Sequence, residues 1–203
     1  MNKVILAKKY SKKYHRGQIR KKDGSPYYMH PYSVVKILKN YGYKSEDVLC
    51  IAYLHDTLED TELTYDEIKK VFGKYISKSV YTLSRNKGDI NKTTGKISKK
   101  RYKDRILESN IDVQRVKIAD MIHNTSTLNV LSVLSIEKKL IDSYEFYIPL
   151  GKHVSSDMIK KLEKNIKDYF NIDVSKRKYS KYFEEVLKLI EDTYKIKINN
   201  KFK

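Results

Sequence analysis

The side chains best suited to chemistry are concentrated in one short segment, His55-Asp56-Thr57-Leu58-Glu59-Asp60. The segment closes an apolar stretch, 46–58, that we expect to be a single helix. On a helix, residues four apart lie one turn above each other, which pairs His55 with Glu59 and Asp56 with Asp60. Acidic groups at a helix C-terminus oppose the helix dipole, and a buried His-Asp pair is costly unless it is paired or bound to a metal. The pattern therefore indicates a cation site rather than a solvated helix end.

Two distant segments contribute further candidates. His30 precedes Pro31, and a lone histidine in such a place is ordinarily structural unless it meets His55. Asp120 lies on an apolar helix and shares one stripe with Asn124 and Thr127, at i+4 and i+7. A polar stripe on an apolar helix faces either water or a site, and the residues alone leave both interpretations open.

The charge is distributed unevenly along the chain. The net charge is +18, yet residues 1–30 carry +8 and residues 46–67 carry −8. A strongly basic protein favours polyanionic partners, and an acidic island within it favours a cation. A lysine-rich composition that only solvates the surface explains many of the basic residues equally well.

Helical spacing of apolar residues dominates the chain and predicts the elements that must position these groups. We expect an all-α protein with no strand, a loop at 145–157, a basic loop at 85–100 and a frayed end from Lys195 to Lys203. Residues 1–130 would form the core, and residues 131–203 would form a helical extension packed on it as one domain. The expected helices are 32–41 and 46–58, then 102–107, 113–128, 130–140, 158–170 and 180–194. Between them, Thr64-Tyr65-Asp66-Glu67 is a capping box that opens a helix with Ile68, Val71 and Phe72 on its apolar face, and the helix resumes after Gly73 with Ile76, Val80 and Leu83.

Composition excludes several classes of protein. Hydrophobic residues make up 40% and charged residues 33% of the chain, which is too apolar for a disordered protein and too polar for a membrane protein. No apolar run reaches the ~20 residues that a bilayer span needs. The single cysteine, Cys50, fits a reducing compartment. We expect a cytoplasmic protein without a membrane partner.

The motifs together resemble the HD superfamily of metal-dependent phosphohydrolases, and the whole series resembles the hydrolase domain of Rel/SpoT enzymes. The resemblance covers roughly residues 3–130. Because no synthetase domain is present, the chain is similar to small alarmone hydrolases of the metazoan SpoT-homologue type. The residues that carry the resemblance are Gln18, 20–24, Pro26-Tyr27, His30-Pro31, His55-Asp56, Glu59-Asp60-Thr61, Phe72-Gly73, 117–120, His123-Asn124 and Thr127-Leu128.

The resemblance implies a helical bundle with a metal site between its helices. The residues that match the family's metal ligands, normally for one Mn²⁺, are His30, His55, Asp56 and Asp120. Two imidazoles and two carboxylates also suit Mn²⁺ on general ligand grounds. The acidic pair that matches the family's catalytic carboxylates is Glu59 and Asp60.

Substrate contacts are implied at two places. Asn124 and Thr127 match residues near the nucleotide, and Lys22 matches a family lysine. The family's arginine before that lysine is Lys21 here, and Arg20 lies one position earlier. Since arginine and lysine are not interchangeable at stacked or bidentate contacts, this departure bears on recognition of the base or phosphate.

The implied reaction is Mn²⁺-dependent hydrolysis of (p)ppGpp to GDP or GTP and pyrophosphate. Two alternatives remain open at this stage. One is a phosphohydrolase for another nucleotide, such as the 2′- or 3′-phosphate of NADPH-like substrates. The other is a non-catalytic basic nucleic-acid-binding HD protein, although we expect nucleic acid not to be a partner. The sequence leaves the oligomeric state undetermined.

Overall fold

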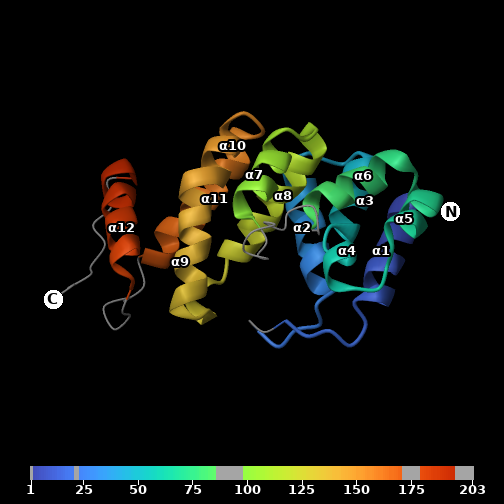
Figure 1. Cartoon of the computed structure of the whole chain (residues 1–203), viewed down its shortest axis with the longest axis horizontal. Helices are drawn as coiled ribbons and strands as arrows, with labels where there is room; N and C mark the ends of the chain where they lie inside the picture. Colours follow the sequence, from blue (N-terminus) through green and yellow to red (C-terminus); the bar gives the residue numbers. More distant parts are fainter. Residues whose placement is uncertain (1, 21–22, 86–97, 171–178, 195–203) are drawn as a thin grey trace. The chain divides into compact units, whose positions relative to one another are not determined.

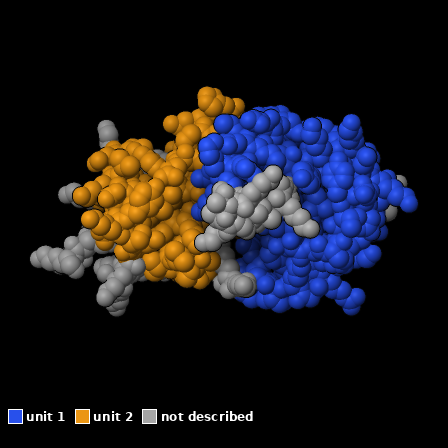
Figure 2. Space-filling model, in the orientation of Figure 1, with its two compact units in different colours: residues 1–120 blue, residues 121–203 orange. Residues whose placement is uncertain are grey.

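The computed structural model describes residues 2–20, 23–85, 98–170 and 179–194 and is all-α, as predicted (Figure 1). The described residues contain one isolated β-bridge, between Ile19 and Pro26, and no strand. The chain divides into two compact units, Met1–Asp120 and Met121–Lys203, which Figure 2 colours separately. The predicted packing of residues 131–203 on the core stays a prediction.

The first unit is built from short helices. Their bounds are α1 Lys3–Tyr14, α2 Met29–Asn40, α3 Glu46–Leu54, α4 Thr57–Asp60, α5 Tyr65–Phe72, α6 Lys74–Leu83, α7 Lys99–Leu107 and the greater part of α8 Ile111–Thr125.

Helix α3 forms the centre of this unit. It packs against α1, α2 and α6. All its side chains from Val48 to Leu54 are buried, including the thiol of Cys50. The Ser45 hydroxyl caps the helix by accepting from the Val48 N–H, and acidic residues occupy the first turn, where they complement the dipole. An element that is apolar on every side is stable only inside a core, which is why the site at its C-terminal end is anchored rigidly.

Two glycines and a capping box mark three helix boundaries. Gly73 separates α5 from α6 with φ of +93°, a conformation that side-chain-bearing residues rarely adopt. Gly42 has φ of +84° just after α2 ends. At the start of α5, Thr64 and Glu67 cap each other reciprocally.

The prediction of one helix over 46–58 was wrong at its C-terminal end. Helix α3 ends at Leu54, and a new short helix begins at Thr57. The Thr57 hydroxyl donates to the Leu54 carbonyl at 2.7 Å and so satisfies a backbone acceptor that the break leaves open. His55 and Asp56 occupy the break itself, and the argument from one continuous helix does not apply to them.

The second unit begins within α8 and is also helical. Its further elements are the 3-10 turn Leu128–Val130, α9 Val133–Asp142, the π-helix Ser143–Tyr147, α10 Ile148–Lys152, α11 Ser156–Phe170 and α12 Lys181–Tyr194. Helix α11 packs against α10, and α9 packs against both the π-helix and α12.

The later part of the chain differs from the prediction in its loops and helix starts. The prediction of a loop at 145–157 was wrong, because most of this segment is helical. Pro149 lies in the first turn of α10, where its missing N–H costs nothing. The predicted basic loop at 85–100 consists mostly of residues 86–97, which lie outside the described residues. The predicted frayed end, Lys195 to Lys203, lies outside them as well. Helix α7 begins at Lys99, earlier than predicted. Among the described helices, none is long and apolar enough to cross a membrane.

Candidate metal centre

Four side chains from three parts of the first unit converge at one point. His30 lies in the first turn of α2, and His55 and Asp56 lie in the break between α3 and α4. Asp120 comes from α8. Both histidines and Asp120 are buried, while Asp56 is partly exposed. The structure therefore brings together the complete set that the sequence predicts as metal ligands.

The converging atoms are one nitrogen or oxygen from each side chain. The two histidine Nε2 atoms are 3.2 Å apart. Asp56 Oδ2 lies 3.4 Å from His30 Nε2 and 3.1 Å from His55 Nε2. Asp120 Oδ1 lies 3.1 Å from His30 Nε2 and 4.0 Å from His55 Nε2. Neighbouring donors around one divalent ion are about 3 Å apart when each lies about 2.1 Å from the ion. The ligand atoms of His30, His55 and Asp56 all lie within 4.8 Å of one another and fit a single cation, and Asp120 adjoins this group through His30.

Hydrogen bonding outside the cluster prepares His55 for such a role. Its Nδ1 lies 2.8 Å from the Ala52 carbonyl, which can only accept, so Nδ1 carries the proton. The lone pair of Nε2 then faces the other donors. A backbone acceptor behind a histidine is the usual way that proteins fix the ring of a metal ligand.

Lys117 plays a comparable part behind Asp120. Its ammonium lies 2.9 Å from Asp120 Oδ2, which leaves Oδ1 to face His30. Burial alone would raise the pKa of Asp120, but Lys117 and the two histidines hold it far below its ordinary value. Burial likewise opposes ionisation of Asp56, and His55 and His30 outweigh it, so the pKa of Asp56 also falls well below normal.

The pKa of His55 reflects the same balance. Burial would lower it, but the Asp56 carboxylate, with a smaller effect of Asp120, raises it to about 9. Without a cation, a proton therefore supplies the positive charge that the cluster needs. The two carboxylates and two imidazoles form a site built around positive charge, which is the chemistry of a cation centre.

Glu59 and Asp60 lie in α4, at the exposed edge of the cluster. Glu59 accepts the backbone N–H of Arg85 at 2.9 Å, and the Arg85 guanidinium lies 3.7 Å away. Partial desolvation raises the pKa of Glu59 despite that arginine, and desolvation together with the Asp56 charge raises the pKa of Asp60. Elevated carboxyl pKa values beside a polar cluster are typical of groups that exchange protons.

Tyr27 is a site residue to which the sequence analysis assigned no role. Its hydroxyl lies 2.8 Å from Asp56 Oδ2 and 3.1 Å from Asp60 Oδ2, so it links the predicted ligand to the predicted catalytic pair. Burial and the neighbouring carboxylates raise the pKa of Tyr27 far above normal, which keeps it a donor. The sequence feature that could have pointed to Tyr27 is its place in the Pro26-Tyr27 motif.

A second layer lies behind Tyr27. The His15 ring packs against Tyr27 with centroids 4.8 Å apart and ring planes tilted by 35°, and its Nδ1 lies 2.7 Å from Gln18 Oε1. Gln18 Nε2 in turn donates to the Asp60 carbonyl at 2.6 Å. Burial lowers the pKa of His15, so the ring is neutral and acts as a packed hydrogen-bonding group. From the sequence, Gln18 was recognisable only as part of the motif series.

The predicted substrate residues are less completely placed. Arg20 donates its backbone N–H to the Ser25 carbonyl in the turn that the Ile19–Pro26 bridge closes. Lys21 and Lys22 lie outside the described residues. Asn124, in the last turn of α8, and Thr127 belong to the second unit, so their contacts with a nucleotide stay predictions.

The profile of the HD domain family matches residues 7–150, which is more than half of the chain and extends beyond the 3–130 expected. The chain belongs to the HD domain family. The metal cluster and its supporting residues all lie within the matched range. Divalent metal dependence goes with this family, and the geometry of the cluster fits it.

Individual proteins give the same likeness. The chain is 33% identical to the GTP pyrophosphokinase rsh of Brucella melitensis, over 85% of this chain and 24% of that protein. It is 33% identical to the guanosine-3′,5′-bis(diphosphate) 3′-pyrophosphohydrolase of Aquifex aeolicus, over 77% of this chain and 22% of that protein. The chain thus spans about a quarter of the length of these relatives.

Among solved structures, a metazoan orthologue of SpoT described as hydrolysing ppGpp has the same fold. The TM-score is 0.71 at 22% sequence identity, with 83% of this chain and 96% of the other covered. At that identity the likeness establishes the helical architecture.

Proposed function

We propose that the protein hydrolyses (p)ppGpp to GDP or GTP and pyrophosphate in a reaction that depends on Mn²⁺. The observation that carries the proposal is the convergence of His30, His55, Asp56 and Asp120, with Glu59 and Asp60 at the open edge of the cluster. The relatives named for ppGpp hydrolysis support the choice of substrate.

The four converging side chains would hold the metal. Two nitrogen and two carboxylate donors suit Mn²⁺, which accepts both ligand types. A divalent ion bound there would lower the pKa of water and neutralise charge on phosphate oxygens. Lys117 keeps Asp120 ionised and the Ala52 carbonyl orients His55, so the donors are held ready for the ion.

The protein's own groups would do the remaining work. Glu59 takes the proton of the attacking water, whose oxygen bonds to phosphorus as the bond to the 3′-oxygen breaks. Tyr27 fixes the Asp60 carboxylate beside it. The raised pKa of Glu59 makes it a stronger base than an ordinary carboxylate. Substrate contacts are proposed for Arg20, Lys21, Lys22, Asn124 and Thr127.

A second candidate has one specific observation in its favour. Lys21 stands where the Rel/SpoT pattern has arginine, and a lysine cannot reproduce bidentate or stacked contacts. The same metal cluster could then serve another nucleotide with a 2′- or 3′-phosphate, since metal and acids do not discriminate between leaving groups. The single buried thiol of Cys50 supports a reducing compartment, and we propose that the protein works in the cytoplasm.

A substrate panel tests the function. Purified protein with Mn²⁺ is incubated with ppGpp, pppGpp, NADPH and a 3′-nucleotide, and the products are separated by ion-exchange chromatography. We expect GDP or GTP and pyrophosphate from the first two, and loss of turnover by at least a hundredfold in Glu59→Gln, in line with the size of general-base effects. Wild-type turnover in that variant, or activity confined to the other nucleotides, would contradict the proposal.

The metal assignment has a readout that does not depend on activity. Elemental analysis of purified protein should find about one Mn²⁺ per chain after loading and much less in His55→Ala. The matched control is His153→Ala, which alters an exposed histidine of the second unit. Equal metal in His55→Ala and wild type would exclude this cluster as the binding site.

A further inference from the structure

The outer face of α1 is a continuous basic surface. We call this face, together with the two hollows beside it, the α1 groove. Lys8, Lys9, Lys12, Lys13 and Arg16 are all exposed and recur at spacings of one, three and four residues along α1 and its C-terminal turn. Residues 3–16 contain six basic and no acidic residues. The helical spacing therefore places several like charges within one turn of each other.

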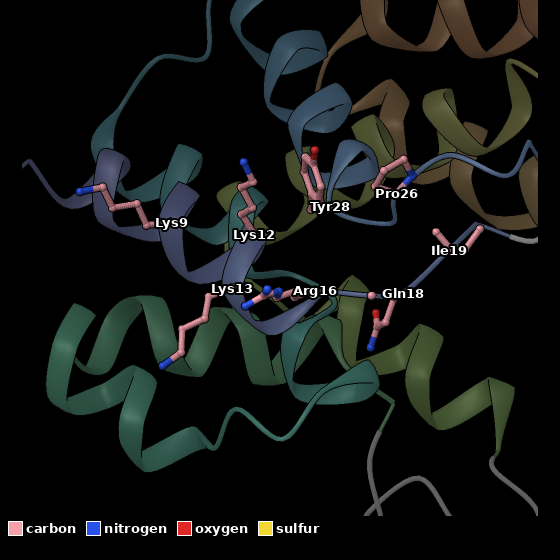
Figure 3. A pocket seen from close by; sticks show the side chains of 9 residues that line it. Lys9, Lys12, Lys13, Arg16, Gln18, Ile19, Pro26 and Tyr28 are labelled. Atoms are coloured by element: carbon pink, nitrogen blue, oxygen red, sulfur yellow. The ribbon is translucent and has the colours of Figure 1, made fainter.

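Two adjoining hollows lie along this surface. One, of about 630 Å³, is lined by α1 lysines, Arg16, Gln18, Ile19, Pro26 and Tyr28 (Figure 3). The other, of about 560 Å³, is lined by Ile5, Lys8, Met29 and Tyr32 and shares Lys9, Lys12 and Tyr28 with the first. The shared lining residues make one continuous groove of the two hollows.

Aromatic rings are interleaved with the cations. The Lys12 ammonium lies 5.4 Å from the centre of the Tyr28 ring, and the Lys8 ammonium lies 4.9 Å from that of Tyr32. The two tyrosines contact each other edge-on, with centroids 5.6 Å apart. Exposed Ile19 and Met29 add apolar surface. The groove thus offers flat apolar contacts at the same places as positive charge.

Such a surface has an energetic cost in the free protein. Like charges four residues apart destabilise a helix, and α1 has two such pairs, Lys8–Lys12 and Lys9–Lys13, with Arg16 in the turn just beyond its end. Phosphate groups would relieve the repulsion, and bases would cover the tyrosine rings.

We propose that the α1 groove binds single-stranded RNA. Aromatic faces alternating with cations are the recurring design of sequence-tolerant single-strand sites, because every base has a face that can stack and every nucleotide carries a phosphate. A duplex would present its backbone but no base faces to the tyrosines. The groove adjoins the metal cluster at Gln18, whose amide reaches the Asp60 carbonyl, and at Met29, which precedes His30, but its lining includes none of the proposed metal ligands.

The test measures binding of a fluorescein-labelled 12-nucleotide RNA of mixed sequence by anisotropy at several salt concentrations. The variant combines Lys9→Ala, Lys12→Ala, Lys13→Ala and Arg16→Ala. The matched control combines Lys39→Ala, Lys44→Ala, Lys74→Ala and Lys78→Ala, which removes the same charge from exposed positions outside the groove.

We expect the groove variant to raise the dissociation constant at least tenfold. Its salt slope should fall by about 3, since each phosphate contact on a single strand contributes about 0.7 to the slope. The control should change affinity no more than threefold. Tyr28→Ala should weaken binding severalfold and Tyr28→Phe should not, because stacking needs the ring and not the hydroxyl.

Three results would overturn the proposal. Equal losses in the groove variant and its control would show non-specific attraction to net charge. Binding to vesicles containing phosphatidylserine, without binding to the RNA, would assign the groove to a membrane surface. A raised KM for ppGpp in the groove variant, with RNA affinity unchanged, would assign it to the substrate. Circular dichroism checks that each variant is folded, and wild-type ppGpp turnover is scored separately from RNA binding.

Discussion

One hydroxyl group, that of Tyr27, connects the two functional parts of the cluster. It donates toward a carboxylate of the ligand set and a carboxylate of the catalytic pair. Its hydrogen bond lowers the pKa of Asp60, partly offsetting the rise from desolvation. The site is therefore a network in which the position of one phenol affects both metal donor and acid.

Replacing that phenol gives a direct test. Tyr27→Phe keeps the ring packed against His15 and removes the two contacts, so we expect kcat for ppGpp or Mn²⁺ affinity to fall about 10–100-fold, the usual effect of losing a partner behind a ligand. Steady-state kinetics and metal titration check this, with Tyr28→Phe as the adjacent control. Wild-type values for both quantities would contradict the role.

Arg85 sets the protonation of Glu59 in part, since its positive charge lowers the Glu59 pKa while desolvation raises it. A base must be deprotonated to act, so activity should rise with pH through a Glu59 pKa above the ordinary 4.5. Arg85→Ala removes the charge and should move this acidic limb of kcat to still higher pH. The pH profile of the variant is compared with that of Arg16→Ala, and an unmoved limb would contradict the prediction.

At this scale the sequence predicted much of the site. Residue types and order identified all four converging side chains, because each stands in a recognisable motif. Tyr27, Gln18 and Lys117 stood in the same motifs, but their roles depend on contacts across 3 to 42 positions of sequence. A linear pattern contains no information on which hydroxyl or amide meets which carboxylate.

The elements determine how these residues meet. Helix α3 ends at Leu54, and His55 and Asp56 form the turn before α4 with backbone angles that stay in the right-handed helical region. In this turn Asp56 Oδ2 lies 3.1 Å from His55 Nε2. Leu54 and Leu58 keep helical spacing across the turn, which is why the sequence pattern predicted one helix. The π-helix and α10 were missed for a related reason, since Pro149 and Gly151 were interpreted as turn residues.

Gly73 tests the element scale. At φ of +93° an alanine would be strained, although the added Cβ meets no atom within 4 Å. We expect Gly73→Ala to lower the free energy of unfolding by about 1–3 kcal/mol, because its backbone angles, φ of 93° and ψ of 170°, lie in a region that is essentially restricted to glycine. Urea denaturation measures this. Helical Gly151→Ala is a control without a positive φ, and no difference between Gly73→Ala and wild type would contradict the argument.

For the whole molecule, the division into two units separates the metal cluster from residues 121–203. A ligand that binds only the folded state stabilises it, by about 2.7 kcal/mol at a hundred times its Kd. The first unit contains every proposed ligand, so the stabilisation should belong to it.

The charge distribution along the chain was predictable from the sequence. The α1 groove was not, because only the fold places Tyr28 beside Lys12.

Calorimetry with and without Mn²⁺ should show the stabilisation by the metal. Metal removal by EDTA should lower the unfolding temperature of the protein by about 5–10 °C, given about 2–4 °C per kcal/mol for a chain of this size. His55→Ala should make the protein insensitive to EDTA. An unchanged unfolding temperature after EDTA, or an equal shift in His55→Ala, would contradict the metal assignment.

The burial of Cys50 has a practical consequence. Desolvation, helped by Glu46 and Asp47, raises the pKa of its thiol to about 12, so almost no thiolate exists near neutral pH. A thiol reagent can reach the sulfur only when α3 leaves the core. Because the sequence has no other cysteine, the rate of alkylation in the native protein measures how often α3 opens, and this measurement needs no engineered label.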